Sequence, residues 1–282
     1  MSGFIKYKWK YTLTNLLYIF YGNTKAPDEV LFMTHERTKD WILGAKARRL
    51  SRNFMKDSRV FYSSNFKKIP DAKGYFFLHY KYFSKAIRYN PGIRKRKSVV
   101  MFTHPEWNKF YTKKHVAYIL NMAANTICLN SAIKEGLIRN GVKKEKLNLF
   151  HMASNPELFK PKQRKGNGSV GFSMAYYERE NPDIYSKMDV LVSPSHIEGG
   201  PVPLLEAMLC NVVPVATRTG FGPDLIKHGE NGFLFDSTAP VDEVIPLIKK
   251  AYKLKANVRE AAEPHSWKNY GEKIGKLFQV DK

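Results

Sequence analysis

The sequence predicts an α/β protein that is built on parallel β-sheets and divided into two domains. Short apolar runs of strand length alternate with longer stretches that have room for crossover helices, which is the order of a doubly wound parallel sheet. A polar, basic, glycine-containing segment at 160–168 has the composition of a linker. The chain has 282 residues, 43% of them hydrophobic, which is enough for two modest cores.

The predicted strands are short apolar runs bounded by turn residues. In the first half of the chain they are residues 30–34, 60–63, 75–79, 99–103, 126–129 and 147–150, and in the second half 169–173, 190–193, 212–217 and 233–235. Helices are predicted at 41–50, 115–124, 132–140, 204–209 and 241–254, with a last amphipathic helix that runs through residue 278. Because ligands of parallel sheets bind at the carboxyl ends of the strands, we expect functional residues directly after these runs.

The composition indicates an anionic partner. With 47 Lys and Arg against 25 Asp and Glu, the formal net charge is +22, and a nucleic acid, an anionic membrane surface or a phosphorylated substrate would each suit it. Cys128 and Cys210 both lie in apolar runs, so we expect reduced, buried thiols in a cytoplasmic protein and no disulfide. The eight histidines show no metal-ligand spacing.

Residues 1–27 form a basic and aromatic N-terminal segment. The segment contains four lysines, seven aromatic residues and no acidic residue. Its longest uncharged run, 11–23, is too short to span a bilayer and precedes no small-residue cleavage site, so we expect neither an anchor nor an export signal. Two interpretations remain open: a peripheral contact with an anionic leaflet, or a helix packed on the first domain.

Residues 189–236 carry the most specific pattern. The strand at 190–193 leads into a loop with Glu198, Gly199 and Gly200, and a helix follows with proline in its first turn. Glycines leave backbone N–H groups uncovered at the start of a helix, where the helix dipole attracts an anion such as phosphate. Seven residues separate Glu198 from Glu206, so both carboxylates are predicted to reach one elongated ligand.

This stretch resembles the family 4 retaining glycosyltransferases, also described as glycosyl transferases group 1. The resemblance rests on EGGPVPLLE, followed in the family's order by a strand, a glycine-rich loop at 219–222 and the turn GENG at 229–232. The structural alternative is a plain strand–helix–strand unit with a solvated glutamate on its helix. The resemblance implies the GT-B fold, in which two Rossmann-like domains face a cleft.

The resemblance also implies the domain organisation. We expect an acceptor domain at 28–160, a nucleotide-sugar donor domain at 161–262 and a helix at 263–282 that crosses back to the first domain. The family usually has two further strand–helix units before the Glu-Gly motif, and they are missing here. The second domain is therefore abbreviated, either in the protein itself or because this sequence lacks a segment.

The family pattern assigns roles to matching residues. Glu198 would hold the donor sugar, and His104, which follows a strand, would lie near the transferred sugar; a histidine held by loop hydrogen bonds is its alternative. Glu206 would accept hydrogen bonds from the ribose hydroxyls. The rest of the donor pocket would come from Gly199, Gly200, Pro201, Thr219 and Gly220. No metal and no cofactor are expected, because positive groups and a helix N-terminus stabilise the departing diphosphate.

Two positions depart from the family. The arginine and lysine that bind the donor diphosphate are replaced by Ala175 and Glu180, although Arg179 would substitute if the loop shifts by one residue. The sequence thus favours a retaining, metal-independent transferase in the cytoplasm or peripheral on the membrane. It would use a UDP- or GDP-linked sugar and a glycan or lipid-linked acceptor. The alternatives are a catalytically degenerate GT-B subunit and a nucleic-acid-binding protein; no nucleic-acid-binding motif is present, and we expect no such partner.

Overall fold

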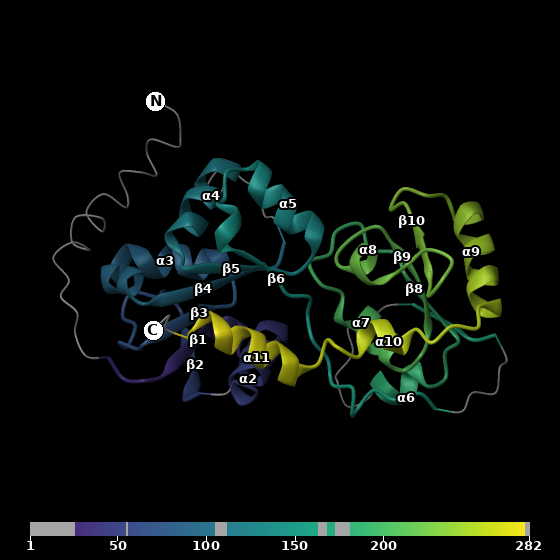
Figure 1. The fold of residues 1–282 in the computed structure, drawn as a ribbon, viewed down its shortest axis with the longest axis horizontal. Helices are drawn as coiled ribbons and strands as arrows, with labels where there is room; N and C mark the ends of the chain where they lie inside the picture. Colours follow the sequence, from purple (N-terminus) through teal and green to yellow (C-terminus); the bar gives the residue numbers. More distant parts are fainter. Residues whose placement is uncertain (1–25, 55, 105–111, 163–167, 173–180, 280–282) are drawn as a thin grey trace. The chain divides into compact units, whose positions relative to one another are not determined.

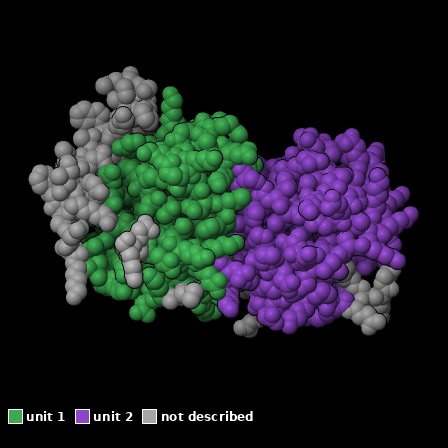
Figure 2. All heavy atoms as spheres, viewed as in Figure 1, with its two compact units in different colours: residues 1–128, 132–150, 270–282 green, residues 129–131, 151–269 purple. Residues whose placement is uncertain are grey.

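A computed structural model describes residues 26–54, 56–104, 112–162, 168–172 and 181–279, and they form an α/β protein (Figure 1). The chain divides into two compact units (Figure 2). Unit 1 comprises residues 1–128, 132–150 and 270–282, and unit 2 comprises 129–131 and 151–269. The described part of each unit is organised around one parallel sheet.

The sheet of unit 1 has six strands in the order β2-β1-β3-β4-β5-β6, and all neighbours are parallel. The strands are β1 (Val30–His35), β2 (Ser58–Ser63), β3 (Gly74–Phe77), β4 (Lys97–Phe102), β5 (Asn125–Cys128) and β6 (Leu147–Leu149). The helices are α2 (Ile42–Arg52), α3 (Tyr80–Tyr89), α4 (Lys113–Met122), α5 (Ser131–Arg139) and α11 (Trp267–Leu277), of which α11 belongs to unit 1 from Tyr270 on. All six strands predicted in this part of the sequence are confirmed.

Central strands of this sheet are buried on both faces, which is why they read as continuous apolar runs in the sequence. All four residues of β3 are buried, as are five of the six in β1. The predicted strand at 75–79 ends two residues early, because the Nδ1 atom of His79 accepts a hydrogen bond from the Lys81 N–H and caps α3. Gly141, at φ +90°, ends α5 in a Schellman motif through the bonds Gly141 N–H to Ile138 O and Val142 N–H to Leu137 O.

Unit 2 contains a four-stranded parallel sheet in the order β10-β9-β8-β7. The strands are β7 (Val170–Phe172), β8 (Val190–Ser193), β9 (Val213–Thr217) and β10 (Phe233–Phe235), and the helices are α6 (Asn181–Tyr185), α7 (Val202–Leu209), α8 (Gly222–Leu225), α9 (Val241–Lys253) and α10 (Arg259–Ala262). Alternate residues of β8, β9 and β10 pack with Ala251 of α9 in one core. The four strands predicted here are confirmed.

The predicted GENG turn joins α8 to β10. Gly229 has φ +87°, a conformation that favours glycine. The Asn231 side chain accepts a hydrogen bond from the Lys227 N–H at 2.7 Å and donates to the Leu225 carbonyl at 3.1 Å. This turn therefore has a structural task, which is to set where β10 begins.

Among the described residues, no helix is long and apolar enough to cross a membrane. Residues 1–25 lie outside the described ranges, so both interpretations of the N-terminal segment stay predictions. The division of the chain into an acceptor domain and a donor domain likewise stays a prediction.

Candidate functional site

Glu198 lies on the loop between β8 and α7, and hydrogen bonds fix this loop to the end of β9. The Ser195 hydroxyl donates to Oε1 of Glu198 at 3.1 Å. The Ser195 carbonyl in turn accepts from the hydroxyls of Thr217 at 2.7 Å and Thr219 at 3.2 Å. The half-buried carboxylate is thereby held at the carboxyl edge of the parallel sheet, where ligands of such sheets bind.

Gly220 brings the loop after β9 against the Glu198 loop. Its φ is +58°, and a Cβ atom at this position would lie 2.7 Å from Pro201 Cδ and 3.0 Å from Glu198 Cβ. Any side chain would therefore separate the two loops or strain the backbone. The fold thus assembles Glu198, Pro201, Thr219 and Gly220, four residues that the sequence assigned to one site.

The first turn of α7 presents backbone donors beside Glu198. Pro203 has no N–H, and the N–H groups of Leu204 and Leu205 bond back to the Pro201 carbonyl. The amides of Gly200 and Val202 donate to no acceptor within the described part of the chain. The Gly199 carbonyl accepts from the buried Asn130 side chain at 2.8 Å, which fixes the glycine pair. This helix start has the properties of an anion site.

Glu206 lies in the second turn of α7 and is 5% exposed. Tyr185 of α6 donates its hydroxyl to Oε2 of Glu206 at 3.2 Å. A carboxylate held in this way accepts hydrogen bonds in a fixed direction, which suits recognition of a diol. Its predicted bond to a ribose stays a prediction.

In unit 1, three histidines gather at the carboxyl ends of neighbouring strands. His35 ends β1, His79 follows β3 and His104 follows β4. The ring centroids of His79 and His104 are 6.3 Å apart, and the Tyr82 ring lies 5.5 Å from His79 and 6.1 Å from His35. Sequence reasoning identified His104 and missed the other two, although each ends or directly follows a strand run.

Hydrogen bonds fix the ring orientations of His35 and His79. Nδ1 of His35 accepts from the Arg37 N–H and Nδ1 of His79 accepts from the Lys81 N–H, both at 3.1 Å. In a neutral ring the proton is then on Nε2, so both rings offer an N–H donor there. Nδ1 of His104 shares a hydrogen bond of 3.1 Å with the Thr103 hydroxyl. The order of the sheet also reverses between β1 and β3, which is the usual ligand position of doubly wound sheets.

Asp224 in α8 is the centre of a hydrogen-bond network in unit 2, which sequence reasoning also missed. It accepts hydrogen bonds from the backbone N–H of Ser131 at 2.9 Å and from the Ser131 hydroxyl, and it bonds His151 Nε2 at 2.9 Å. Burial alone would raise the pKa of Asp224, but the hydrogen bonds from His151 and Ser131 outweigh it and hold the pKa below the ordinary 3.8. This network anchors the helix that follows the Gly220 loop.

Arg179, Ala175 and Glu180 lie outside the described residues, so the predicted contact of Arg179 with the donor diphosphate stays a prediction. Within the ranges that the structure describes, no group of three or more His, Cys, Asp or Glu residues is arranged to hold a metal ion.

The family comparison covers the Glu198 loop and the Gly220 loop together. Residues 157–274 match the family model described as "Glycosyl transferases group 1". This part of the chain is therefore similar to that family. The match begins after His104, so it covers the stretch with the predicted site residues of unit 2 and does not reach His104 in unit 1. The roles of all these residues stay predictions. The finer resemblance to family 4 stays a prediction.

Two curated relatives align over about a third of the chain. One is N-acetyl-alpha-D-glucosaminyl L-malate synthase of Bacillus anthracis, 33% identical over 102 residues that make up 35% of this chain and 26% of the relative. Another is D-inositol 3-phosphate glycosyltransferase of Corynebacterium jeikeium, 32% identical over 102 residues, 34% of this chain and 24% of the relative. The matched region thus spans about a quarter of these relatives' length.

Solved structures match most of the chain. Sucrose-phosphate synthase from Thermosynechococcus elongatus has a TM-score of 0.67 at 12% identity, over 89% of this chain and 98% of the other. Anabaena HepE in complex with UDP has a TM-score of 0.66 at 14% identity, over 88% of this chain and 98% of the other. At such identities the likeness shows the fold alone, and it confirms the predicted α/β fold of GT-B type.

Proposed function

We propose that the protein is a glycosyltransferase that takes a sugar from a nucleotide-sugar donor. The observation that carries the proposal is the geometry around Glu198. Ser195 fixes its carboxylate, Gly220 lies close to its Cβ atom, and the amides of Gly200 and Val202 donate to no acceptor among the described residues. The group 1 match covers these residues. The named activities of the curated relatives and the UDP bound in HepE support the donor class.

In this proposal each part of the site binds one part of the donor. Glu198 accepts hydrogen bonds from the sugar hydroxyls, and the amides of Gly200 and Val202 donate to the diphosphate. Glu206 accepts from the ribose, while Thr219, Gly220 and Pro201 shape the pocket wall. Arg179 adds positive charge at the diphosphate, and His104 acts at the transferred sugar.

The reaction breaks the bond between the anomeric carbon and the diphosphate oxygen and forms a bond from that carbon to an acceptor hydroxyl oxygen, whose proton is released. Charge develops on the departing diphosphate, and the fixed amides of α7 stabilise it without reorganising. We propose a metal-independent reaction with retained anomeric configuration. The basic N-terminal segment supports a glycan or lipid-linked acceptor at an anionic membrane surface.

Replacing Glu198 by glutamine tests the donor site. Glu198→Gln keeps the size of the side chain but removes its charge, so we expect transfer to fall by at least about a hundredfold with little change in melting temperature. Calorimetry against UDP- and GDP-sugars measures the donor affinity of the same variant. Glu243→Gln, at an exposed position of α9, is the matched control. Full activity in a folded Glu198→Gln protein would refute the proposal.

Product stereochemistry and metal dependence test the mechanism. Proton NMR of the first product should show the anomeric configuration of the donor, and excess EDTA should leave the rate unchanged. An inverted product, or a rate that EDTA abolishes and Mg²⁺ restores, would contradict the retaining, metal-independent reaction.

One observation favours a second candidate, a degenerate subunit that binds a partner and transfers nothing. The two positions where the family has diphosphate-binding cations hold Ala175 and Glu180. This candidate predicts no measurable heat with any nucleotide sugar, whereas the transferase predicts saturable binding to one of them. The same calorimetric panel therefore separates the two.

A further inference from the structure

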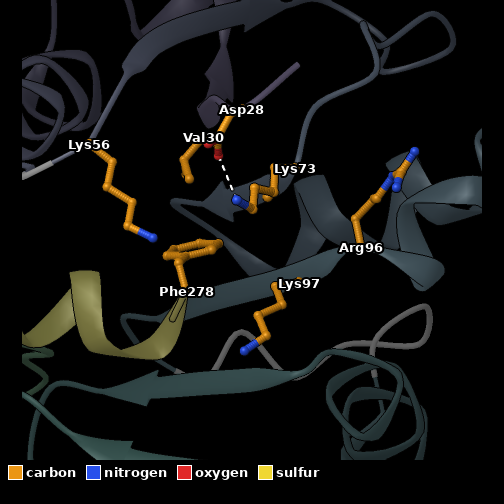
Figure 3. Close-up of a pocket in the computed structure, with 8 residues that line it drawn as sticks. Asp28, Val30, Lys56, Lys73, Arg96, Lys97 and Phe278 are labelled. Atoms are coloured by element: carbon orange, nitrogen blue, oxygen red, sulfur yellow. Dashed lines mark hydrogen bonds and ion pairs between the residues drawn. The ribbon is translucent and has the colours of Figure 1, made fainter. Parts of the chain in front are cut away.

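A small basic pocket lies in unit 1 at the edge of the sheet where the strands begin. Its volume is about 140 Å³. The side chains that matter here are Lys56, Lys73, Arg96, Lys97, Asp28 and Phe278 (Figure 3). Lys73 precedes β3, Lys97 begins β4, Asp28 precedes β1 and Lys56 precedes β2. The parallel topology thus gathers the charges from four separate segments of sequence.

The pocket has an excess of positive charge. Lys73 pairs with Asp28 at 2.7 Å and Arg96 with Asp71 at 2.9 Å, so these four cations are balanced by two carboxylates among the described residues. Figure 3 shows the Lys56 and Lys97 amino groups on the two sides of the Phe278 ring and the Arg96 guanidinium turned away from it. The Asp28 side chain is 76% exposed, so its ion pair contributes little and an incoming anion can replace it.

Packing against the core fixes the apolar wall of the pocket. The Phe278 ring is 4% exposed and lies edge-on to Phe54, with ring centroids 5.8 Å apart. It fills the space above Gly74, where a Cβ atom would lie 2.6 Å from two ring atoms. Lys97 donates to the Gln279 carbonyl, just beyond the end of α11. This wall is therefore preorganised, which lowers the cost of ordering the site around a ligand.

We propose that this pocket binds a phosphate monoester on a small polar scaffold, either a soluble metabolite or the headgroup of a membrane lipid. A phosphate monoester carries a charge of about −1.5 to −2 at pH 7, which matches the excess of two cations. Lysine amino groups bind phosphate oxygens by charge-assisted hydrogen bonds. The volume suits a group of this size and is well below the roughly 300–1,000 Å³ of pockets for drug-sized ligands.

The pocket is remote from the sugar-site candidate of unit 1. Lys97 begins β4 and His104 follows its end, and at about 3.3 Å per residue the two are roughly 20 Å apart. A ligand in the pocket therefore touches no residue assigned to the donor or to transfer. Its binding is measurable while excess UDP is present.

The test is calorimetry of glycerol 3-phosphate binding at low ionic strength with UDP in excess. We expect the wild-type protein to bind and the double variant Lys56→Gln/Lys73→Gln to bind at least about tenfold more weakly, because each lysine donates a charge-assisted hydrogen bond to the phosphate. The control is Lys249→Gln/Lys250→Gln, which removes the same charge from exposed positions of α9 in unit 2. Circular dichroism and melting temperature verify the folding of each variant.

A second arm replaces the probe by phosphatidylcholine vesicles with and without phosphatidic acid, and sedimentation measures the bound protein. Variant-sensitive binding of glycerol 3-phosphate or of the phosphatidic acid vesicles supports the pocket and identifies the source of the phosphate. The proposal is overturned if neither probe binds, if UDP displaces glycerol 3-phosphate, or if the control variant loses as much affinity as the pocket variant. Failure of nucleotide-sugar binding would leave these outcomes unchanged.

Discussion

At the scale of single residues, Asp224 shows how one carboxylate holds a site together. Its side chain is 14% exposed and bonds two segments far from it in sequence, at Ser131 and His151. The His151 ring also lies edge-on to Phe221, with centroids 5.9 Å apart. Phe221 directly follows Gly220, so Asp224 supports the loop that faces Glu198.

Asp224→Asn should destabilise unit 2 in a pH-dependent way. The folded-state pKa lies below the ordinary 3.8, so the carboxylate stabilises the fold above pH 3.8 and loses this contribution as the pH falls through the folded value. We expect the variant to be about 1–3 kcal/mol less stable than wild type at pH 7. Below pH 3.8 the difference between their unfolding free energies should become smaller. Urea unfolding of wild type, of Asp224→Asn and of the exposed control Asp40→Asn at each pH measures this loss of unfolding free energy. A difference that is the same at pH 7 and at low pH would show that the charge plays no part.

At the scale of elements, α7 is fixed at both ends. Its start bears the Glu198 loop, and its end forms a Schellman motif in which Asn211 has φ +59°, with bonds Asn211 N–H to Met208 O and Val212 N–H to Ala207 O. The Asn211 side chain also accepts from the Val258 N–H at 2.9 Å, just before α10. The position of the candidate site thus depends on contacts at the far end of the helix.

Arg259 of α10 joins this end of α7 to the segment before β7. Its guanidinium donates to the Leu209 carbonyl in the last turn of α7 at 2.6 Å, and to the carbonyls of Phe159 at 2.7 Å and Pro156 at 3.1 Å. Arg259→Met keeps the apolar stem but leaves these carbonyls unpaired, so we expect a loss of about 3 kcal/mol by urea unfolding. Glu263→Gln, which removes only the partner carboxylate that is 59% exposed, should cost less than about 1 kcal/mol. Equal losses of unfolding free energy in the two variants would show that the bonds of Arg259 to these carbonyls do not stabilise the fold.

At the scale of the whole molecule, stability lies in two cores, one around each parallel sheet. The ion pairs of the described residues add little, since most involve side chains about half exposed or more, such as Lys160 with Glu157 and Lys162 with Asp183. Each unit also contains one fully buried cysteine thiol, Cys128 in unit 1 and Cys210 in unit 2. The thiols are therefore separate reporters of the two units.

Native protein should not react with a thiol reagent. Both cysteines are inaccessible, and burial raises the pKa of Cys128 to about 12, so its thiolate is scarce even at pH 9. We expect less than about a tenth of either thiol to be labelled in native buffer and both to be labelled in urea. Mass spectrometry of peptides then shows at which urea concentration each unit opens. Stoichiometric labelling of native protein would contradict the burial of these residues.

The sequence by itself determined the ten strands and the Glu198 loop. These features follow from local rules: apolar runs of strand length, proline at the start of α7, and glycine where the backbone needs a positive φ. The recognisable order EGGPVPLLE, TGFG and GENG identified the glycosyltransferase group because those residues are close in sequence. The limits of some elements moved, as at His79, where a side-chain cap ended a strand early. The helix α3 and the short helices α6, α8 and α10 were not predicted.

Only the tertiary structure decided which distant residues meet. The bond of Asp224 to Ser131 spans 93 residues, and the histidine group at His35, His79 and His104 and the basic pocket at Lys56, Lys73 and Lys97 both depend on strand order. Strand order is not encoded in local periodicity. It results from which pairing buries the most apolar surface across the whole chain, and it therefore becomes visible only in the folded molecule.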